Sequence, residues 1–162
     1  MPLNFNLRHL EKGPLHLRGE LSPEELDLVG MDEMIRIEGN VQYDLAVERL
    51  SQSVLVQGSL RFRLECQCVR CLTPFTQNEE IRDWVCDLPL EGEERVPVTN
   101  DCIDLTPYLR EDTLLAFPQH PLCGPDCRGL LGPDHNLNEP ASVEKQASGA
   151  SAAWAELNKL KF

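Results

Sequence analysis

Residues 54 to 66 show the clearest alternation of hydrophobic and polar positions in the chain. One side of an extended strand would carry the apolar residues and one glycine, namely Val54, Val56, Gly58, Leu60, Phe62, Leu64 and Cys66. The intervening positions are mostly polar or charged, and a period of two is typical of a β-strand with one buried face. Residues 75–86 carry Ile81, Trp84 and Val85 among charged residues, which predicts an antiparallel return strand. A tight cysteine-containing turn would join the two strands.

Three other segments alternate in the same way. Residues 35–47 keep a period of two over a long run, and Gly39 marks a place for a bulge or bend. Residues 3–7 and the segment that starts at Leu15 predict two short strands whose apolar faces can pair, separated by a turn at residues 12–14. These patterns predict a sheet of antiparallel strands.

Two segments carry signals for helices. Ser22-Pro23-Glu24-Glu25 combines an N-cap, a proline at the first helical position and a capping-box glutamate, which predicts a brief helix that runs toward Val29. A similar signal at Thr106, with the following proline, predicts a second helix that extends to Phe117. The sheet-facing side of this second helix would carry Leu105, Leu109 and Ala116, flanked by Tyr108 and Leu115.

The last part of the chain predicts irregular structure and one more helix. Residues 118–140 are rich in proline, glycine and asparagine, so something other than regular hydrogen bonding has to hold them. Residues 139–150 are small and polar, which indicates a flexible linker. Trp154, Leu157 and Leu160 recur at helical spacing and predict a short C-terminal helix.

Together these elements predict an α+β fold. We expect an antiparallel, curved or barrel-like β-sheet with a covering helix, a cysteine-containing irregular segment and a short C-terminal helix. The chain has 162 residues, which is enough for one domain with a modest core. We expect a single α+β domain over residues 1–138, followed by a flexible linker and the C-terminal helix over residues 139–162.

The charge of the chain narrows the choice of partners. Lys and Arg total 15 against 27 Asp and Glu, so the net charge is -12. A phosphate backbone would repel such a chain as a whole, so direct RNA contact is not favoured. An acidic surface suits basic partners, ribosomal proteins among them, and the alternative is that the charge only keeps the protein soluble.

The sequence also indicates a compartment. No apolar run approaches the roughly 20 residues of a membrane span, and the N-terminal residues lack the basic and apolar blocks of a signal peptide. We therefore expect a cytoplasmic protein that makes no membrane contact. The cysteine count of seven is odd, which favours reduced thiols or metal ligands over a disulfide framework.

Two cysteine pairs are the candidates for chemistry. Cys68 and Cys71 have Cys-x-x-Cys spacing, which suits either one metal ion or a redox step, and Cys123 and Cys127 form the other closely spaced pair. All four thiolates could make a tetrahedral zinc site if the two segments meet. Inert thiols and thiol redox chemistry remain alternatives. Cys66 could compete as a ligand, but its place on the apolar strand face favours a core residue.

Arginines beside the cysteine turn form a local basic patch in an acidic chain. An RNA contact, if one exists, would be placed at this patch, whose members are Arg61, Arg63, Arg70 and Arg82. The alternative is cross-strand pairing with carboxylates, and we favour pairing with Glu65, Glu79 and Glu80.

The chain resembles a known family. Residues 64–75, Leu-Glu-Cys-Gln-Cys-Val-Arg-Cys-Leu-Thr-Pro-Phe, closely resemble the signature of the YceD family of large ribosomal RNA accumulation proteins. The tail common in bacterial members is resembled by residues 121–123, 126–130 and 136–138 and by residues 154–157 and 159–160 of the closing helix, so the likeness spans most of residues 54–162. The resemblance implies a role in the synthesis, processing or stability of the large-subunit ribosomal RNA, with no catalytic activity assigned.

The chain departs from this family at one place. Many members carry further cysteines where this chain has residues 131–135, Leu-Gly-Pro-Asp-His. A metal knuckle confined to the tail would therefore be incomplete here. The comparison leaves the two cysteine pairs as the complete ligand set, or His135 as a substitute ligand.

Two classes of function follow from these observations. The first is a non-enzymatic factor that binds a large-subunit ribosomal protein or a ribosomal precursor through its acidic surface or the arginine patch, with Trp154 as a further candidate contact. The second is a thiol/disulfide redox enzyme that uses Cys68 and Cys71, or a generic zinc-stabilised interaction module. The sequence carries no serine-histidine-acid arrangement, glycine-rich phosphate loop or helix-borne metal motif, so we favour the non-enzymatic factor.

Overall fold

The computed structural model describes residues 3–130. Three expectations lie outside the described residues: the domain boundary near residue 138, the linker at 139–150, and the C-terminal helix that contains Trp154. The substitute ligand His135 lies outside them as well.

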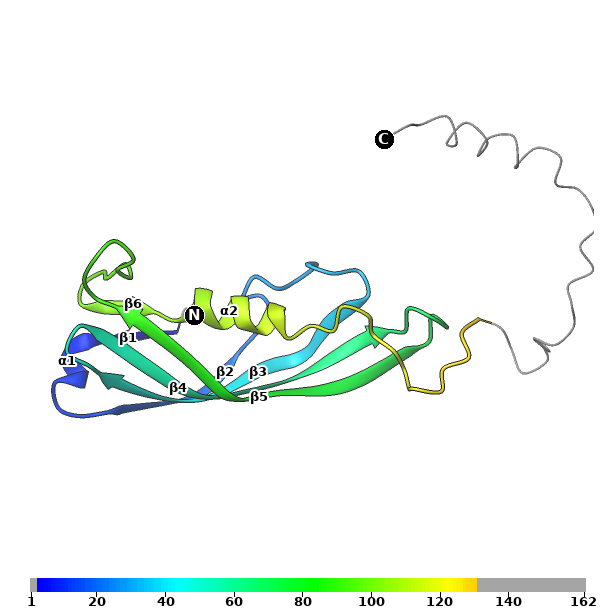
Figure 1. Ribbon diagram of the computed structural model, residues 1–162, viewed down its shortest axis with the longest axis horizontal. Coiled ribbons are helices and arrows are strands. Elements are labelled where there is room, and N and C mark those ends of the chain that lie inside the picture. Colours follow the sequence, from blue (N-terminus) through cyan, green and yellow to red (C-terminus); the bar gives the residue numbers. More distant parts are fainter. Residues whose placement is uncertain (1–2, 131–162) are drawn as a thin grey trace, which may run out of the picture. The chain divides into compact units, whose positions relative to one another are not determined.

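Four antiparallel strands form the main sheet, in the order β2 (Leu15–Leu21), β3 (Ile35–Arg49), β4 (Ser53–Gln67) and β5 (Pro74–Pro89) (Figure 1). The alternation that predicted β4 is confirmed, because its side chains on the core face are buried, from Val54 to Cys66. The predicted return strand is β5, which pairs antiparallel with β4 along its length. Strand periodicity thus located both arms of the hairpin that carries the cysteine turn.

The expectation of a barrel-like sheet is wrong. β2 and β5 are the two edges of the sheet and do not pair with each other, so the sheet stays open. Four strands are fewer than the roughly five to eight that small barrels have. The core instead lies between one face of the sheet and a second layer.

Two irregularities bend the main sheet. The register between β3 and β4 shifts between Glu38 and Gln42, and Gly39 has a φ of +80° there, which confirms the predicted bulge. A second shift lies between Gly58 and Leu60, where β4 meets β5. Gly58 also lies so close to β3 that a Cβ atom would be 2.0 Å from the carbonyl oxygen of Asp44. Only glycine fits this crossing point without displacing the neighbouring strand.

The N-terminal strand has a different partner from the one expected. β1 (Asn4–Asn6) pairs with β6 (Cys102–Asp104) in a separate two-stranded sheet, whereas β2 pairs with β3. The chain turns away after β1 because a short helix, α1 (Leu7–Leu10), begins there. Asn6 caps this helix by accepting a 2.9 Å hydrogen bond from the backbone N–H of Arg8.

The expected brief helix after β2 is a turn. The capping box forms, because the Ser22 hydroxyl accepts from the Glu25 N–H and the Glu25 carboxylate accepts from the Ser22 N–H. Asp27 then has a φ of +51°, which a right-handed helix cannot contain. The turn still places Leu26 and Leu28 in the core.

The covering helix is α2 (Thr106–Leu115), and it lies along one face of the main sheet (Figure 1). Leu109 is buried as predicted, but Leu115 is 81% exposed, so its predicted place on the sheet-facing side is wrong. Thr113 is buried instead, since it follows Leu109 by one helical turn. Leu105 occupies the N-cap position without a side-chain hydrogen bond, and the Thr106 hydroxyl accepts from the Leu3 N–H at 2.9 Å rather than capping the helix.

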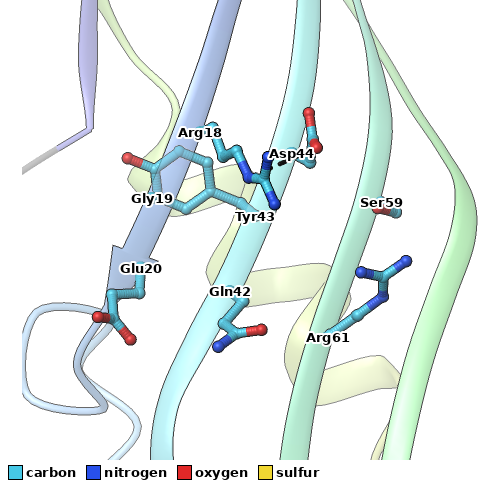
Figure 2. A pocket seen from close by; sticks show the side chains of 8 residues that line it. All are labelled: Arg18, Gly19, Glu20, Gln42, Tyr43, Asp44, Ser59 and Arg61. Carbon is cyan, nitrogen blue, oxygen red and sulfur yellow. Dashed lines mark ion pairs between the residues drawn. The ribbon is translucent and has the colours of Figure 1, made fainter.

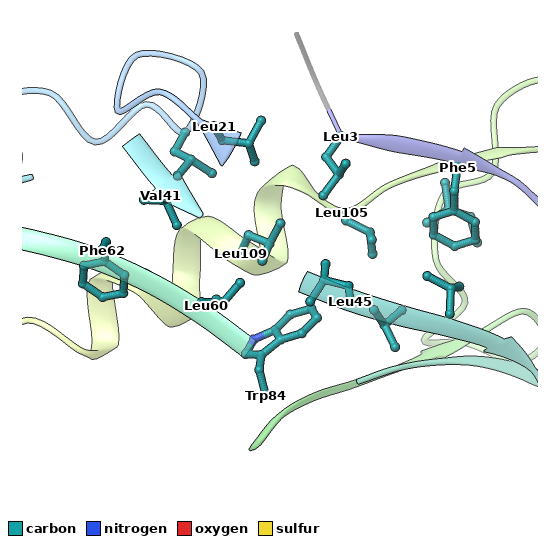
Figure 3. Close-up of a cluster of buried hydrophobic side chains, with 14 of the residues drawn as sticks. Leu3, Phe5, Leu21, Val41, Leu45, Leu60, Phe62, Trp84, Leu105 and Leu109 are labelled. Atoms are coloured by element: carbon teal, nitrogen blue, oxygen red, sulfur yellow. The ribbon is translucent and has the colours of Figure 1, made fainter. Parts of the chain in front are cut away.

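The core joins the sheet to this second layer. Figure 3 shows Leu60 and Trp84 of the sheet facing Leu105 and Leu109 on the side of α2. The indole N–H of Trp84 donates a 2.5 Å hydrogen bond to the Asp112 carboxylate, which ties the helix to β5. Each such apolar side chain contributes about 2 kcal/mol when it leaves water. No helix among residues 3–130 is long and apolar enough to cross a membrane.

Candidate metal centre

Four cysteines from two distant segments come together at the far end of the β4–β5 hairpin. Cys68 and Cys71 lie in the hairpin turn, and Cys123 and Cys127 lie in the irregular segment after α2. The four Sγ atoms are all within 4.8 Å of one another. Cys68 Sγ is 3.7 Å from Cys127 Sγ, and Cys71 Sγ is 3.6 Å from Cys123 Sγ. From the sequence, the two pairs were expected to lie together only if they bind one metal ion. The structure places all four thiols in one cluster.

Backbone hydrogen bonds fold the hairpin turn around its two cysteines. The Cys68 N–H donates to the carbonyl of Thr73 at 3.0 Å, and the Leu72 N–H donates back to the carbonyl of Cys68 at 2.9 Å. Leu72 has a φ of +59°, which closes the turn, and the Gln67 side chain donates to the Leu72 carbonyl. The turn therefore holds the Cys68 and Cys71 thiols on its inner side.

The second segment packs against this turn. The Val69 N–H donates to the carbonyl of Pro121 at 3.0 Å, and the Cys127 N–H donates to the carbonyl of Gly124 at 3.2 Å. Gly129 has a φ of +76°, and a Cβ atom there would lie 3.5 Å from the Arg70 carbonyl. The segment from residue 118 to residue 130 has no helix or strand, as its composition predicted. Contacts with the hairpin turn position it instead.

The surroundings of Cys68 favour the thiolate. Backbone N–H groups of Cys123, Cys71 and Arg70 donate to its sulfur and lower its pKa to about 6, although burial opposes this change. The Thr73 hydroxyl lies 3.3 Å from Cys71 Sγ and is the main reason that the pKa of Cys71 is lowered too. The hairpin pair is therefore set up to carry negative charge.

The pKa values of the second pair, Cys123 and Cys127, are raised instead. The neighbouring thiols of Cys71, Cys127 and Cys68 raise the pKa of Cys123 to about 12. Like charges this close together repel, so four thiols on their own do not all ionise. A divalent cation would remove that repulsion and hold all four as thiolates.

The donor set fits one type of ion well. Zinc bound by thiolates has bond lengths of about 2.3 Å, so tetrahedral geometry places ligand sulfurs about 3.8 Å apart. The Cys68–Cys127 distance of 3.7 Å and the Cys71–Cys123 distance of 3.6 Å are close to that value. Four soft sulfur donors do not suit magnesium or calcium, which prefer oxygen. These residues are thus close enough together, and of the right chemistry, to hold a zinc ion.

The other cysteines do not join this cluster. Cys66 is 2% exposed in the core, and burial raises the pKa of its thiol, so the structure favours its core assignment over that of a competing ligand. Burial raises the pKa of Cys86 to about 11. Cys102 lies beside the Asn6 amide, at 3.4 Å. Thr73 was not among the residues predicted for the site. A hydroxyl two residues after a cysteine in a tight turn could have been recognised from the sequence as a hydrogen-bond partner of the thiol.

The arginine patch is largely paired with carboxylates. Arg61 and Arg82 both contact Glu80, at 2.7 and 2.8 Å, and Arg63 contacts Glu38 at 2.9 Å. The pairing of Arg61 with Glu80 confirms one predicted partner. Glu38 was not predicted, because its position opposite Arg63 depends on the register beside the β3 bulge. Such exposed pairs contribute little to stability, but they occupy the guanidinium groups.

Arg70 is the member of the patch that differs. It lies exposed at the tip of the cysteine turn and makes no ion pair with any of residues 3–130.

The polar face of the sheet carries a shallow hollow of about 260 Å³, and Arg61 is one of the residues that line it. There Arg18 turns toward Asp44, with 3.8 Å between guanidinium and carboxylate (Figure 2). This hollow therefore presents charges of both signs.

Comparisons with known proteins identify a family and distant relatives. The family model described as Large ribosomal RNA subunit accumulation protein YceD matches residues 56–161. Uncharacterized proteins of Mycobacterium bovis and of two Mycobacterium tuberculosis strains are each 30% identical over 113 residues, which cover 65% of this chain and 53% of each relative. The chain thus spans about half the length of the curated relatives it matches. No solved structure matches it significantly.

Proposed function

The chain belongs to the YceD family of large ribosomal RNA subunit accumulation proteins, and from this premise we propose that it is a non-enzymatic factor in ribosome biogenesis. Its role would be to support the synthesis, processing or stability of large-subunit ribosomal RNA by binding a ribosomal component. The observation that carries this proposal is the family match over residues 56–161, which includes the cysteine turn and the second cysteine pair.

The cysteine cluster would serve this factor as a structural zinc site. Residues 118–130 contain no helix or strand, and an ion shared by Cys68, Cys71, Cys123 and Cys127 would fix that segment to the hairpin. When bound, zinc with four protein ligands supplies no open position for a substrate or water. The ion would therefore stabilise the fold and would not take part in a reaction.

A thiol redox function is the second candidate, and one observation favours it. The lowered pKa of Cys68, about 6, is a feature of reactive cysteines. The Cys68 side chain is fully buried, however, so a substrate disulfide has no access to its sulfur. The Cys-x-x-Cys turn also closes a hairpin, whereas redox motifs of this spacing open a helix. We therefore prefer the structural role.

The charge of the chain points to a basic partner. The net charge is -12, and Arg61 and Arg63 on the polar sheet face are paired with carboxylates. We infer that the main partner is a basic protein of the large subunit or its precursor in the cytoplasm, with Trp154 of the C-terminal segment as a further candidate contact. Direct RNA contact through the paired arginines is the less favoured route.

Depletion of the protein in its own organism tests the proposed function. We expect the ratio of large-subunit to small-subunit ribosomal RNA to fall, and to recover with the wild-type gene. Complementation with a Cys71→Ser variant should fail if the zinc site is needed, whereas Cys86→Ser, outside the cluster, should complement. An unchanged RNA ratio after depletion would refute the role in RNA accumulation.

A further inference from the structure

An apolar hollow of about 310 Å³ lies beside the cysteine cluster. Its walls come from four separate segments: the connection before β3, the cysteine turn, the end of α2 and the segment that follows it. Its apolar lining consists of Met31, Met34, Ile35, Val69, Leu114, Phe117, Pro118 and Pro121. We call this surface the methionine hollow.

The methionine hollow exposes apolar side chains to water. Met31 is 50% exposed and Val69 is 42% exposed, although both lie next to well-packed structure. Exposed apolar surface that is gathered in a concave site marks binding surfaces more often than single exposed residues do. Methionine is also common at surfaces that accept different apolar side chains, because its side chain is flexible and polarizable.

The cysteine cluster forms part of this hollow. Val69 lies between Cys68 and Cys71 in the turn, and Pro121 lies just before Cys123. The 3.0 Å hydrogen bond from the Val69 N–H to the Pro121 carbonyl joins these two walls. An ion held by the four cysteines would therefore fix the shape of the hollow without contacting what binds there.

The charged residue in the described lining of the hollow is a carboxylate, and the guanidinium at its margin, Arg110 Nη2 at 3.9 Å from Met31 Sδ, is paired with Asp27 at 3.5 Å. Asp32 lines the hollow, and its Oδ1 accepts hydrogen bonds from the N–H groups of Met34 and Ile35 at 2.6 and 3.0 Å, so the carboxylate is held in place. A smaller hollow that shares Met34 is lined by three charged residues, the carboxylates Glu33 and Glu65 and the guanidinium of Arg36. Within the part of the chain that the structure describes, the lining of the methionine hollow contains no Lys or Arg.

We propose that the methionine hollow binds an amphipathic, basic segment of a protein partner. Leucine-like side chains of that segment would fill the hollow, and its Lys or Arg side chains would face Asp32 and Glu33. This inference rests on the proposed function, because it names the surface at which a basic ribosomal protein docks. RNA suits the site poorly, since the lining offers phosphate no cation.

Binding of a labelled amphipathic peptide of leucine and lysine to the full-length, zinc-loaded protein tests the proposal by fluorescence anisotropy. Leu114→Asp and Met31→Asp place a carboxylate in the hollow and should weaken binding about tenfold or more. Leu115→Asp and Val29→Asp are matched controls, because these neighbouring apolar residues are exposed and lie outside the lining. The controls should bind within about twofold of wild type.

Several outcomes would overturn the proposal. These are no binding to the wild-type protein, equal losses in the hollow and control variants, or tighter binding of a matched leucine-glutamate peptide. Preference for a single-stranded RNA oligonucleotide, for a peptide of residues 151–162, or for a second copy of the protein would identify a different occupant.

The same variants separate the inference from the proposed function. If the hollow variants bind peptide normally while depletion still lowers large-subunit RNA, the docking site is wrong and the function stands. If depletion leaves the RNA ratio unchanged while peptide binding behaves as expected, the function is wrong and the docking site stands.

Discussion

Val69 donates a 3.0 Å backbone hydrogen bond to Pro121, and this bond joins the hairpin turn to a segment that is distant in sequence. Val69 directly follows Cys68, and Pro121 lies two residues before Cys123. The hydrogen bond and the cysteine cluster therefore both lie where the hairpin turn contacts the segment after α2. Loss of the cysteines on one side of the contact should be detectable as loosening on the other side.

The first prediction concerns this coupling. Replacement of Cys68 with serine should speed amide hydrogen exchange in residues 118–130 about tenfold or more, because an ion held by all four cysteines would link the two segments. Cys86→Ser is the control, since Cys86 lies outside the cluster. Unchanged exchange in residues 118–130 of the Cys68 variant would show that the segments hold together without a shared ion.

The second prediction concerns metal content. Mass spectrometry under non-denaturing conditions should find one zinc ion per chain, with the ligands Cys68, Cys71, Cys123 and Cys127. Serine at any of these positions should lower the zinc content, and Cys102→Ser should leave it unchanged. Detection of only the metal-free mass in wild-type protein purified without chelator would contradict this assignment.

The third prediction concerns Gly58. A Cβ atom at this position would lie 2.0 Å from the Asp44 carbonyl oxygen, so Gly58→Ala has to push β3 and β4 apart. We expect the free energy of unfolding to fall by about 3 kcal/mol, as measured by chemical denaturation. Gly124→Ala is the control, because no atom lies within 4 Å of its Cβ position. An unfolding free energy equal to that of wild type would mean that the strands have room to separate.

The fourth prediction concerns pH. Burial, followed by the nearby carboxylates of Asp112 and Asp87, raises the pKa of Cys86 from its ordinary 9.0 to about 11. Between these values the folded protein keeps a proton that the unfolded chain loses, so this thiol's contribution to stability is present below pH 9 and is lost as the pH rises toward 11. Unfolding measured across this range should show a shallower decline for Cys86→Ala. Identical pH profiles for the two proteins would contradict the raised pKa.

The fifth prediction concerns the route to the ribosome. Replacement of Arg61, Arg63 and Arg70 with alanine should leave capture of the proposed basic partner unchanged, because two of these side chains already contact carboxylates. Removal of residues 151–162, which include Trp154, should reduce capture. Tight binding of the isolated protein to naked large-subunit RNA at physiological salt, abolished by the triple replacement, would show that RNA is the partner.

Periodicity located the long strands but not all of their partners. Side chains on one face of β4 alternate strictly, so burial on that face could be read from the sequence. The three-residue strand around Phe5 alternates as well, yet alternation says nothing about which strand it pairs with, and that choice depended on where α1 begins. The pairing of Arg63 with Glu38 depended in the same way on a bulge whose register no local pattern defines.

The cysteine cluster was more predictable than the surface beside it. Two pairs of thiols with ligand spacing suggest a common ion, so chemistry supplied a long-range contact that hydrophobic patterns could not. The methionine hollow has no such signal, because Met31, Val69, Leu114 and Pro121 belong to four segments and no motif relates them. Only the folded chain places them around one hollow.

The open sheet has a further consequence for the behaviour of the protein at high concentration. β5 is an edge strand, and its outer backbone groups have no strand partner among residues 3–130. Such edges invite intermolecular pairing and aggregation unless charge or irregularity prevents it. The middle of β5 carries four charged residues, Glu79, Glu80, Arg82 and Asp83. The register shift opposite Gly58 interrupts the strand at the same place. The charged strand that gives the protein part of its acidity thus also disfavours sheet-to-sheet pairing between neighbouring molecules.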